Sequence, residues 1–178
     1  METLADALKE CGAIKFGEFT LASVKKSSFY VDIKKASTNP RILKMIAHCI
    51  SEVLNTRSIY ADYIGCVALG GVPIAVAAAL ETDLRLLIIR KETKEYGTKD
   101  RIVGEIERGR SAVLVEDVTT TGGSVIRATK ILRDEGLVIR HVIAVVDREE
   151  GAMRNLEDAE IDFISLVKVS DLLKNKTK

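Results

Sequence analysis

The sequence predicts an α/β fold in which a mainly parallel sheet is flanked by helices on both faces. Along residues 38–167, short apolar runs alternate with helical patterns, which is the signature of βαβ units. The runs are apolar throughout instead of alternating with polar residues, as expected for strands that are covered on both faces. The 178 residues suit one domain and contain no repeat or linker, so residues 1–178 are expected to fold as a single unit.

The N-terminal segment has a different pattern from the rest of the chain. Leu4, Leu8 and Cys11 recur at helical spacing. Alternating β-forming residues then follow over 16–32, which predicts two paired strands that turn around residues 23–28.

The later elements each carry a start signal or an apolar run. Thr38, Asn39 and Pro40 form a helix start signal, and apolar residues follow on one helix face as far as Asn55. Strands are expected over 64–69, 86–89, 112–115, 142–146 and 161–167, and helices over 73–80, 123–135 and 149–156. This order of elements is Rossmann-like. The tail over 174–178 is expected to fray.

Composition excludes several classes of protein. Lysine and arginine total 27 against 26 acidic residues, so the net charge of +1 gives no general attraction for nucleic acid or an anionic membrane. The uncharged stretch over 63–80 contains Gly70, Gly71 and Pro73, which favour a strand, loop and helix over a membrane span. Three dispersed cysteines indicate a reducing, cytoplasmic setting, and two histidines are too few for a zinc site.

The most informative segment is 113–124, where a buried strand leads into two carboxylates and a turn rich in hydroxyls and glycine. A helix start offers unpaired N–H groups, and glycine lets the backbone close around an anion, so this turn suits a phosphate. The carboxylates of Glu116 and Asp117 suit sugar hydroxyls, or a divalent cation through water. A phosphorylated sugar is therefore the expected ligand. The alternative is that Asp117 or a threonine only caps the helix.

This segment resembles the phosphoribosyl pyrophosphate (PRPP) motif of the type I phosphoribosyltransferases. The resemblance implies that fold, with Glu116 and Asp117 on the ribose hydroxyls and the turn Thr119–Ser124, here called the phosphate loop, around the 5′-phosphate. It also implies Mg²⁺ bound through PRPP, with water between the metal and Asp117 and no direct protein ligand. The PRPP residues expected here are Glu116, Asp117, Val118, Thr119, Thr120, Thr121, Gly122, Gly123 and Ser124.

A second strand end carries Leu69, Gly70 and Gly71, here called the glycine loop, before a helix that starts with proline. It resembles the pyrophosphate loop of the same family. Some relatives have lysine at the position of Gly70, so the backbone N–H groups of Leu69, Gly70 and Gly71 are expected to hold pyrophosphate. A plain tight turn is the alternative, because Gly-Gly turns are common.

A third strand end opens a polar segment, Arg90–Arg101, here called the polar loop. Taken alone, it fits a solvated mobile loop, and an active-site lid has the same composition. It resembles the catalytic loop of the orotate phosphoribosyltransferases, which reaches the neighbouring subunit of a homodimer. The resemblance assigns Arg90, Lys91, Lys94 and Tyr96 to PRPP, with Lys94 catalytic. Tyr96 replaces a frequent histidine and cannot carry a positive charge at neutral pH.

Two further stretches of the sequence indicate which base accepts the phosphoribosyl group. Residues 15–32 resemble the N-terminal hood of the orotate enzymes, so 1–36 are expected to form much of a small hood, although Ala22 and Val24 replace a frequent lysine and glycine. Residues 145–150 resemble the segment that carries an orotate-binding arginine. The resemblance assigns Arg148, Thr120, Phe29 and Tyr30 to orotate. Arg148 alone would also fit a surface or ion-paired residue, because Asp147 and Glu149 adjoin it.

The resemblance implies an enzyme that transfers the phosphoribosyl group of PRPP to orotate and releases pyrophosphate. Catalysis is expected to come from Lys94, Glu116 and Asp117, with Mg²⁺ as cofactor. Two alternatives remain open: a purine or uracil phosphoribosyltransferase of the same fold, and a non-enzymatic regulator that senses PRPP and binds nucleic acid. The absence of a recognisable helix-turn-helix segment argues against the regulator.

Overall fold

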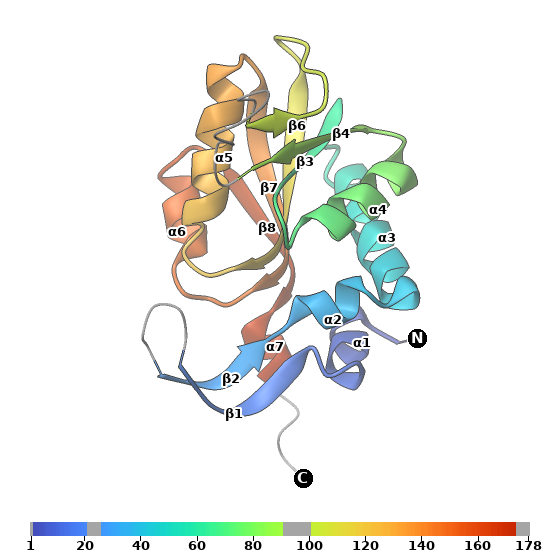
Figure 1. The fold of residues 1–178 in the computed structure, drawn as a ribbon, viewed down its shortest axis with the longest axis vertical. Helices are drawn as coiled ribbons and strands as arrows, with labels where there is room; N and C mark the ends of the chain where they lie inside the picture. Colours follow the sequence, from blue (N-terminus) through green and yellow to red (C-terminus); the bar gives the residue numbers. More distant parts are fainter. Residues whose placement is uncertain (1, 21–25, 91–100, 174–178) are drawn as a thin grey trace, which may run out of the picture.

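The computed structural model describes residues 2–20, 26–90 and 101–173 and contains a six-stranded sheet in the order β5-β4-β3-β6-β7-β8 (Figure 1). The strands are β3 (Tyr63–Val67), β4 (Arg85–Ile89), β5 (Ile102–Val103), β6 (Ser111–Thr119), β7 (Val138–Asp147) and β8 (Asp162–Lys168). All neighbouring pairs are parallel except β4 with the edge strand β5. The predicted mainly parallel sheet is therefore confirmed.

Helices cover both faces of this sheet (Figure 1). Helices α3 (Pro40–Thr56) and α4 (Val72–Thr82) lie on one face, and α5 (Gly123–Asp134) and α6 (Ala152–Glu157) lie on the other. Successive strand residues point to opposite faces, so the buried side chains divide into two cores. Cys66 and Val115 pack in the core of α3 and α4, whereas Val67 and Leu114 pack in the core of α5.

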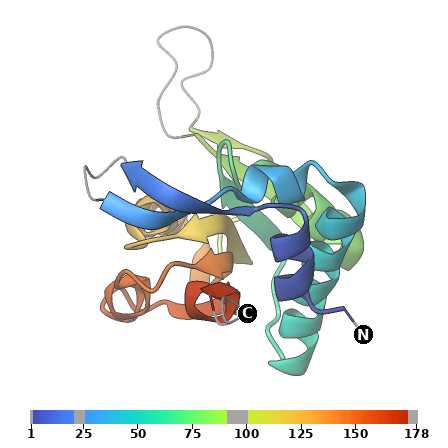
Figure 2. The same cartoon turned by 90° about the horizontal axis from the view of Figure 1, so that it is seen from below.

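The N-terminal segment forms a hairpin and short helices beside the carboxyl ends of the strands. Its elements are α1 (Leu4–Glu10), β1 (Ile14–Thr20), β2 (Lys26–Val31) and α2 (Ile33–Ser37), and β1 pairs antiparallel with β2. The C-terminal helix α7 (Val169–Leu173) packs against α1. Figure 2, viewed from this end, shows the hairpin passing in front of the sheet. The hairpin is thus placed over the strand ends where ligands bind in such folds.

Local start signals explain why the helices begin where they do. The Asn39 side chain caps α3 by accepting from the N–H of Arg41 at 3.0 Å, and Pro40 follows, as the start signal predicted. Thr3 and Asp6 form a reciprocal capping box at α1. The uncharged stretch over 63–80 forms β3, a turn and the start of α4, as predicted. Among the described residues, no helix has the length and apolar character needed to cross a membrane.

Several predicted elements differ from the structure in their bounds. The strand expected over 142–146 begins already at Val138, and the turn expected around residues 23–28 overlaps β2, which begins at Lys26. The strand expected over 64–69 ends at Val67, and the strand expected over 112–115 continues to Thr119. The carboxylates of Glu116 and Asp117 therefore lie within β6 and not after it. The helix expected from Glu149 begins only at Ala152, because Glu149 and Gly151 have φ of 58° and 102°, a left-handed conformation that interrupts a helix.

Candidate active site at the carboxyl ends of the sheet

The glycine loop lies directly against the end of β6. A Cβ atom added to Gly70 would come within 2.7 Å of Asp117 Cγ. No side chain fits there unless the carboxylate moves, so Gly70 and Asp117 occupy one continuous site. The structure thus brings together two segments that are separated by more than 40 residues in the sequence.

Gly71 holds the glycine loop close to the sheet. A Cβ atom on Gly71 would lie 3.1 Å from Cys66 Cβ and 3.2 Å from the Val115 carbonyl oxygen, which is tighter than ordinary packing. The Leu69 carbonyl accepts from the N–H of Val72 at 3.1 Å, which closes the turn. The loop therefore presents backbone at the strand ends, with the Leu69 side chain exposed. This close packing is more than a plain tight turn requires.

The phosphate loop leads into α5, and no side chain caps the start of this helix. Gly122 is the N-cap of α5, with φ of 79°, and no side chain bonds to the N–H groups of the first turn. A Cβ atom on Gly122 would also lie 3.2 Å from Leu156 Cγ. The alternative that Asp117 or a threonine caps this helix is therefore wrong. The first N–H groups of α5 point at the loop, as they do where a helix N-terminus binds an anion.

Neighbouring elements fix the phosphate loop from two sides. Asn155 of α6 donates a hydrogen bond from Nδ2 to the Thr121 carbonyl at 2.8 Å. The N–H of Arg148 donates to the Thr119 carbonyl at 2.9 Å, which joins the ends of β6 and β7. The Thr119 hydroxyl is buried and has no partner among the described residues. These two hydrogen bonds tie the phosphate loop to α6 and to the end of β7.

Arg148 is buried at the end of β7, with 8% of its surface exposed. Its Nε lies 2.9 Å from Glu150 Oε1, and its Cζ lies 5.2 Å from the centre of the Phe29 ring. The alternative of a surface residue is therefore wrong, whereas the alternative of an ion pair holds with a different partner. Asp147 accepts from the N–H of Glu149, and Glu149 accepts from the N–H of Ser170, so both carboxylates are engaged elsewhere.

The hairpin supplies one of its two expected aromatic residues to this place. Phe29 and Tyr30 are consecutive in β2, so their side chains leave opposite faces of the hairpin. Phe29 lies under the Arg148 guanidinium, whereas the Tyr30 ring lies 5.7 Å from the Phe19 ring and is 38% exposed. The structure therefore brings Phe29 to Arg148 and does not bring Tyr30 there. Thr120 directly follows the end of β6 on the phosphate loop and is partly exposed.

Only the two ends of the polar loop fall within the described residues. The N–H of Arg90 donates to the Arg101 carbonyl at 2.8 Å, so the loop leaves and returns at one point on the rim of the site. Lys91, Lys94 and Tyr96 lie outside the described residues, and their assignments remain predictions from the sequence.

Burial shapes the electrostatics around the carboxylate pair. Glu116 is 8% exposed, whereas Asp117 is half-buried. Burial, with a further contribution from the charge of Glu116, raises the pKa of the Cys66 thiol to about 12. Cys66 is therefore a neutral packing residue. No cluster of three His, Cys, Asp or Glu suited to a metal occurs within the described part of the chain.

Sequence reasoning missed two residues that support this site. Asn155 positions the phosphate loop from 34 residues further along the chain, and nothing in its local pattern indicates this contact. Glu150 pairs with Arg148 although it is two residues away, because the left-handed conformation at Glu149 turns the chain back. A signal existed in the second case, since the left-handed turn precedes a glycine, Gly151, at a helix start.

Both the sequence and the fold of this chain are similar to those of known proteins. Residues 32–172 match the phosphoribosyl transferase domain family. An orotate phosphoribosyltransferase of Methanosarcina mazei is 51% identical over 173 residues, which covers 97% of this chain and 91% of that protein. The crystal structure of the orotate phosphoribosyltransferase of Aeropyrum pernix is 30% identical, with a TM-score of 0.87 and 97% of each chain covered. That of Mycobacterium tuberculosis in complex with PRPP is 26% identical, with a TM-score of 0.79 and coverage of 95% and 96%.

Proposed function

The chain belongs to the phosphoribosyltransferase family and is an orotate phosphoribosyltransferase, and we propose that PRPP binds between the glycine loop and the phosphate loop while orotate binds beside Arg148. The reaction transfers the phosphoribosyl group of PRPP to orotate and yields orotidine 5′-phosphate and pyrophosphate. The sequence left two alternatives open: a purine or uracil phosphoribosyltransferase of the same fold, and a regulator that senses PRPP. The relatives near 50% identity named above and those like them are orotate phosphoribosyltransferases and support neither alternative.

The phosphate loop suits the 5′-phosphate of PRPP. The uncapped start of α5 supplies N–H donors and the positive end of the helix dipole, and Gly122 keeps a side chain from filling the space. Asn155 and Arg148 hold the loop through its Thr121 and Thr119 carbonyls, so little ordering is needed on binding. The bound sugar is thereby oriented with its C1′ atom toward the glycine loop.

The carboxylate pair suits the ribose hydroxyls, and the glycine loop suits pyrophosphate. As the bond between C1′ and pyrophosphate breaks, positive charge develops on the ribose ring and negative charge on the leaving group. Glu116 and Asp117 then stabilise the ring, while backbone N–H groups and the cations Arg90, Lys91 and Lys94 stabilise pyrophosphate. Donors fixed before the reaction are the main source of catalysis in such a step, because no covalent help from the protein is needed.

The residues present fit Mg²⁺ bound through the substrate. The Asp117 carboxylate faces Gly70, where the leaving pyrophosphate would lie, and a single carboxylate with substrate oxygens and water is a common magnesium environment. Asp117 would hold the ion through water. When bound, Mg²⁺ neutralises charge on the pyrophosphate oxygens.

The buried Arg148 over Phe29 carries the proposal of orotate as the base. A guanidinium binds a carboxylate through two parallel hydrogen bonds, and orotate differs from uracil by a carboxylate. Phe29 supplies an apolar face beside that fork, and Thr120 supplies a hydroxyl from the phosphate loop. Tyr30, which faces away in the described chain, would reach orotate only if the hairpin moved.

We further propose a cytoplasmic homodimer in which the polar loop of one subunit closes over the site of the other. All three cysteines are free, as suits a reducing compartment.

The experiment that tests the function is an activity assay with a panel of bases, namely orotate, uracil, adenine and hypoxanthine, in the presence of PRPP and Mg²⁺. Loss of orotate absorbance that requires both PRPP and Mg²⁺ is expected, and turnover of another base without turnover of orotate would contradict the proposal.

A further inference from the structure

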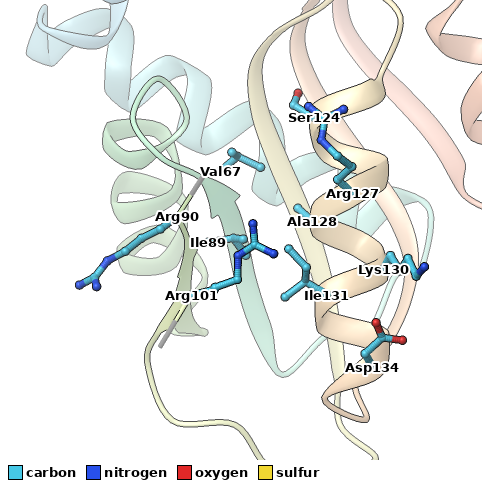
Figure 3. Close-up of a pocket in the computed structure, with 10 residues that line it drawn as sticks. All are labelled: Val67, Ile89, Arg90, Arg101, Ser124, Arg127, Ala128, Lys130, Ile131 and Asp134. Atoms are coloured by element: carbon cyan, nitrogen blue, oxygen red, sulfur yellow. The ribbon is translucent and has the colours of Figure 1, made fainter. Parts of the chain in front are cut away.

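A cavity lies on the face of the sheet that α5 covers (Figure 3). Its volume is about 390 Å³, within the range of pockets that hold small ligands. Val67 and Ile89, from the ends of β3 and β4, and Ile131 of α5 form its apolar wall. The cavity meets the residues assigned to PRPP at Ser124 and Arg90 only, so it adjoins the active site without coinciding with it.

The register of β6 separates this cavity from the Asp117 carboxylate. Val113 and Val115 pack in the core of α3 and α4, and Asp117 continues their alternation and lies over Gly70. Val67 and Ile89 instead belong to the core of α5. The cavity and the Asp117 carboxylate therefore face opposite sides of the sheet.

Positive charge is concentrated around the cavity. Among the described residues, Arg90, Arg101, Arg127 and Lys130 line it with one carboxylate, that of Asp134, although the whole chain has a net charge of only +1. Such a local excess of one sign in a concave site attracts the opposite charge. In Figure 3 the Arg101 side chain points between the β-strands and α5, and Arg127 lies near Ser124 at the start of the helix.

Two of these cations have no competing partner nearby. Within the described residues, Arg127 and Lys130 form no hydrogen bond or ion pair. The Arg127 guanidinium folds back along α5, so that Nη1 would lie 3.5 Å from a Cβ atom on Gly123. Arg127 and Lys130 are three residues apart and thus share one face of the helix. In Figure 3 Lys130 projects from the side of α5 away from the β-strands, so an anion in the cavity would meet Arg127 directly and Lys130 after a rotation of its side chain.

We propose that this cavity is a second binding site, for a nucleoside monophosphate or a ligand of the same chemistry. The phosphate lies between Arg127 and Arg101, with Lys130 adding positive charge from the other side of α5, and the planar base lies against Val67, Ile89 and Ile131. The hydrogen bond that joins Arg90 to Arg101 places both ends of the polar loop on the wall of this site. The occupant therefore contacts the base of the loop that is proposed to close over PRPP.

The test is calorimetric titration with AMP, whose adenine is not the base expected at the orotate site. The chains compared are the wild type, the double variant Arg127→Ala/Lys130→Ala, the matched charge variant Lys44→Ala on α3, and Asp117→Asn. Binding at one AMP per chain is expected for the wild type, Lys44→Ala and Asp117→Asn. The double variant is expected to bind at least about tenfold more weakly, because it loses charge-assisted hydrogen bonds to phosphate.

A second measurement locates the ligand. In isoleucine-methyl NMR spectra, AMP is expected to shift the signals of Ile89 and Ile131, and adenosine at the same concentration is expected to shift them far less. Absence of AMP binding at millimolar concentration would overturn the proposal. So would equal binding by the double variant, or loss of binding in Asp117→Asn, which would place AMP at the active site.

Discussion

The Asp117 carboxylate occupies the space that a side chain on residue 70 would take, with Cγ only 2.7 Å from the position of a Gly70 Cβ. Any side chain at residue 70 would displace this carboxylate. The lack of a side chain at Gly70 thus leaves the space that the Asp117 carboxylate occupies, and substitutions at the two residues can be tested together.

Gly70→Ala is expected to lower kcat/KM by about 10²-fold, the usual effect of a catalytic group moved by about 1 Å. Asp117→Asn is expected to lower kcat/KM as well, because the change removes charge with little change of shape. Since both changes act on one carboxylate, their effects should not add in the double variant. Full additivity, or an unchanged kcat/KM for PRPP in Asp117→Asn, would disprove the assignment. Thermal unfolding of each variant serves as the control for folding.

Arg148→Ala is expected to cost about 2–5 kcal/mol in orotate recognition, because a desolvated carboxylate loses its partner. Arg148→Lys should recover only part of this, since lysine lacks the planar fork. The measurement is kcat/KM for orotate beside the affinity for PRPP, which should hardly change. If orotate turnover survives Arg148→Ala within a few-fold, Arg148 serves only its ion pair with Glu150.

Lys94→Ala is expected to lower kcat more than it alters KM, by about 10²-fold, since a lid cation meets pyrophosphate mainly in the transition state. If the polar loop serves the neighbouring subunit, inactive Lys94→Ala chains mixed with inactive Asp117→Ala chains should regain activity, because one hybrid site has both residues intact. The assay is run on hybrids verified by mass spectrometry of differently tagged chains. No recovery in such hybrids would show that the loop does not act across subunits.

Asp62 links the starts of β3 and β6, and its role predicts a pH effect. Its carboxylate accepts from the Ser111 N–H at 2.8 Å, and this hydrogen bond is the main reason that the pKa of Asp62 lies below its ordinary value of 3.8. A lowered pKa in the folded state stabilises the fold above the ordinary pKa, and the stabilisation is lost as the pH falls through the folded value. The melting temperature of Asp62→Asn should therefore lie below that of the wild type at pH 7. The gap should close below about pH 4; a gap that stays constant from pH 7 to pH 3 would contradict this role.

The cysteines should differ in reactivity. Cys66 is fully buried and has its pKa raised to about 12, whereas Cys11 and Cys49 are partly exposed. Two thiols per native chain are therefore expected to react with a thiol reagent at pH 8, Cys49 slowly because burial and the charge of Glu52 raise its pKa, and the third only after unfolding. A Cys66→Ala variant should show the same two reactive thiols. Three reactive thiols in the native wild type would mean that the β3 core opens easily.

Much of the fold was predictable because its signals are local. The cap at Asn39 and the apolar runs of the inner strands need no knowledge of distant residues. Three short elements were not predicted, namely α2, β5 and α7, because they are held by neighbours and not by their own pattern. The strand β5 has only two residues, and α7 depends on packing against α1.

The sequence predicts which segments form the candidate site, but it does not predict which of their residues contact one another. The spacing in the phosphate loop predicts a phosphate site, and Arg148 follows a buried strand, so both are candidates that the sequence alone can name. The contact of Gly70 with Asp117 and the bond from Asn155 to Thr121 depend on how distant segments meet. Glu149 and Tyr30 show the same limit, because a local turn or the face of a hairpin decides which neighbour a side chain reaches.

The shortness of β5 bears on how the chain avoids aggregation. An edge strand with unpaired backbone groups is a template on which other chains can add, and a strand of two residues offers little of it. The strand β5 covers β4 at Ile88 and Ile89, and Gly104 lies close to the Leu86 carbonyl, where a Cβ atom would come within 2.5 Å of the oxygen, so residues 102–104 together shield this edge. Removing residues 102–104 would uncover β4, so such variants should be checked for fibrils as well as for lost turnover.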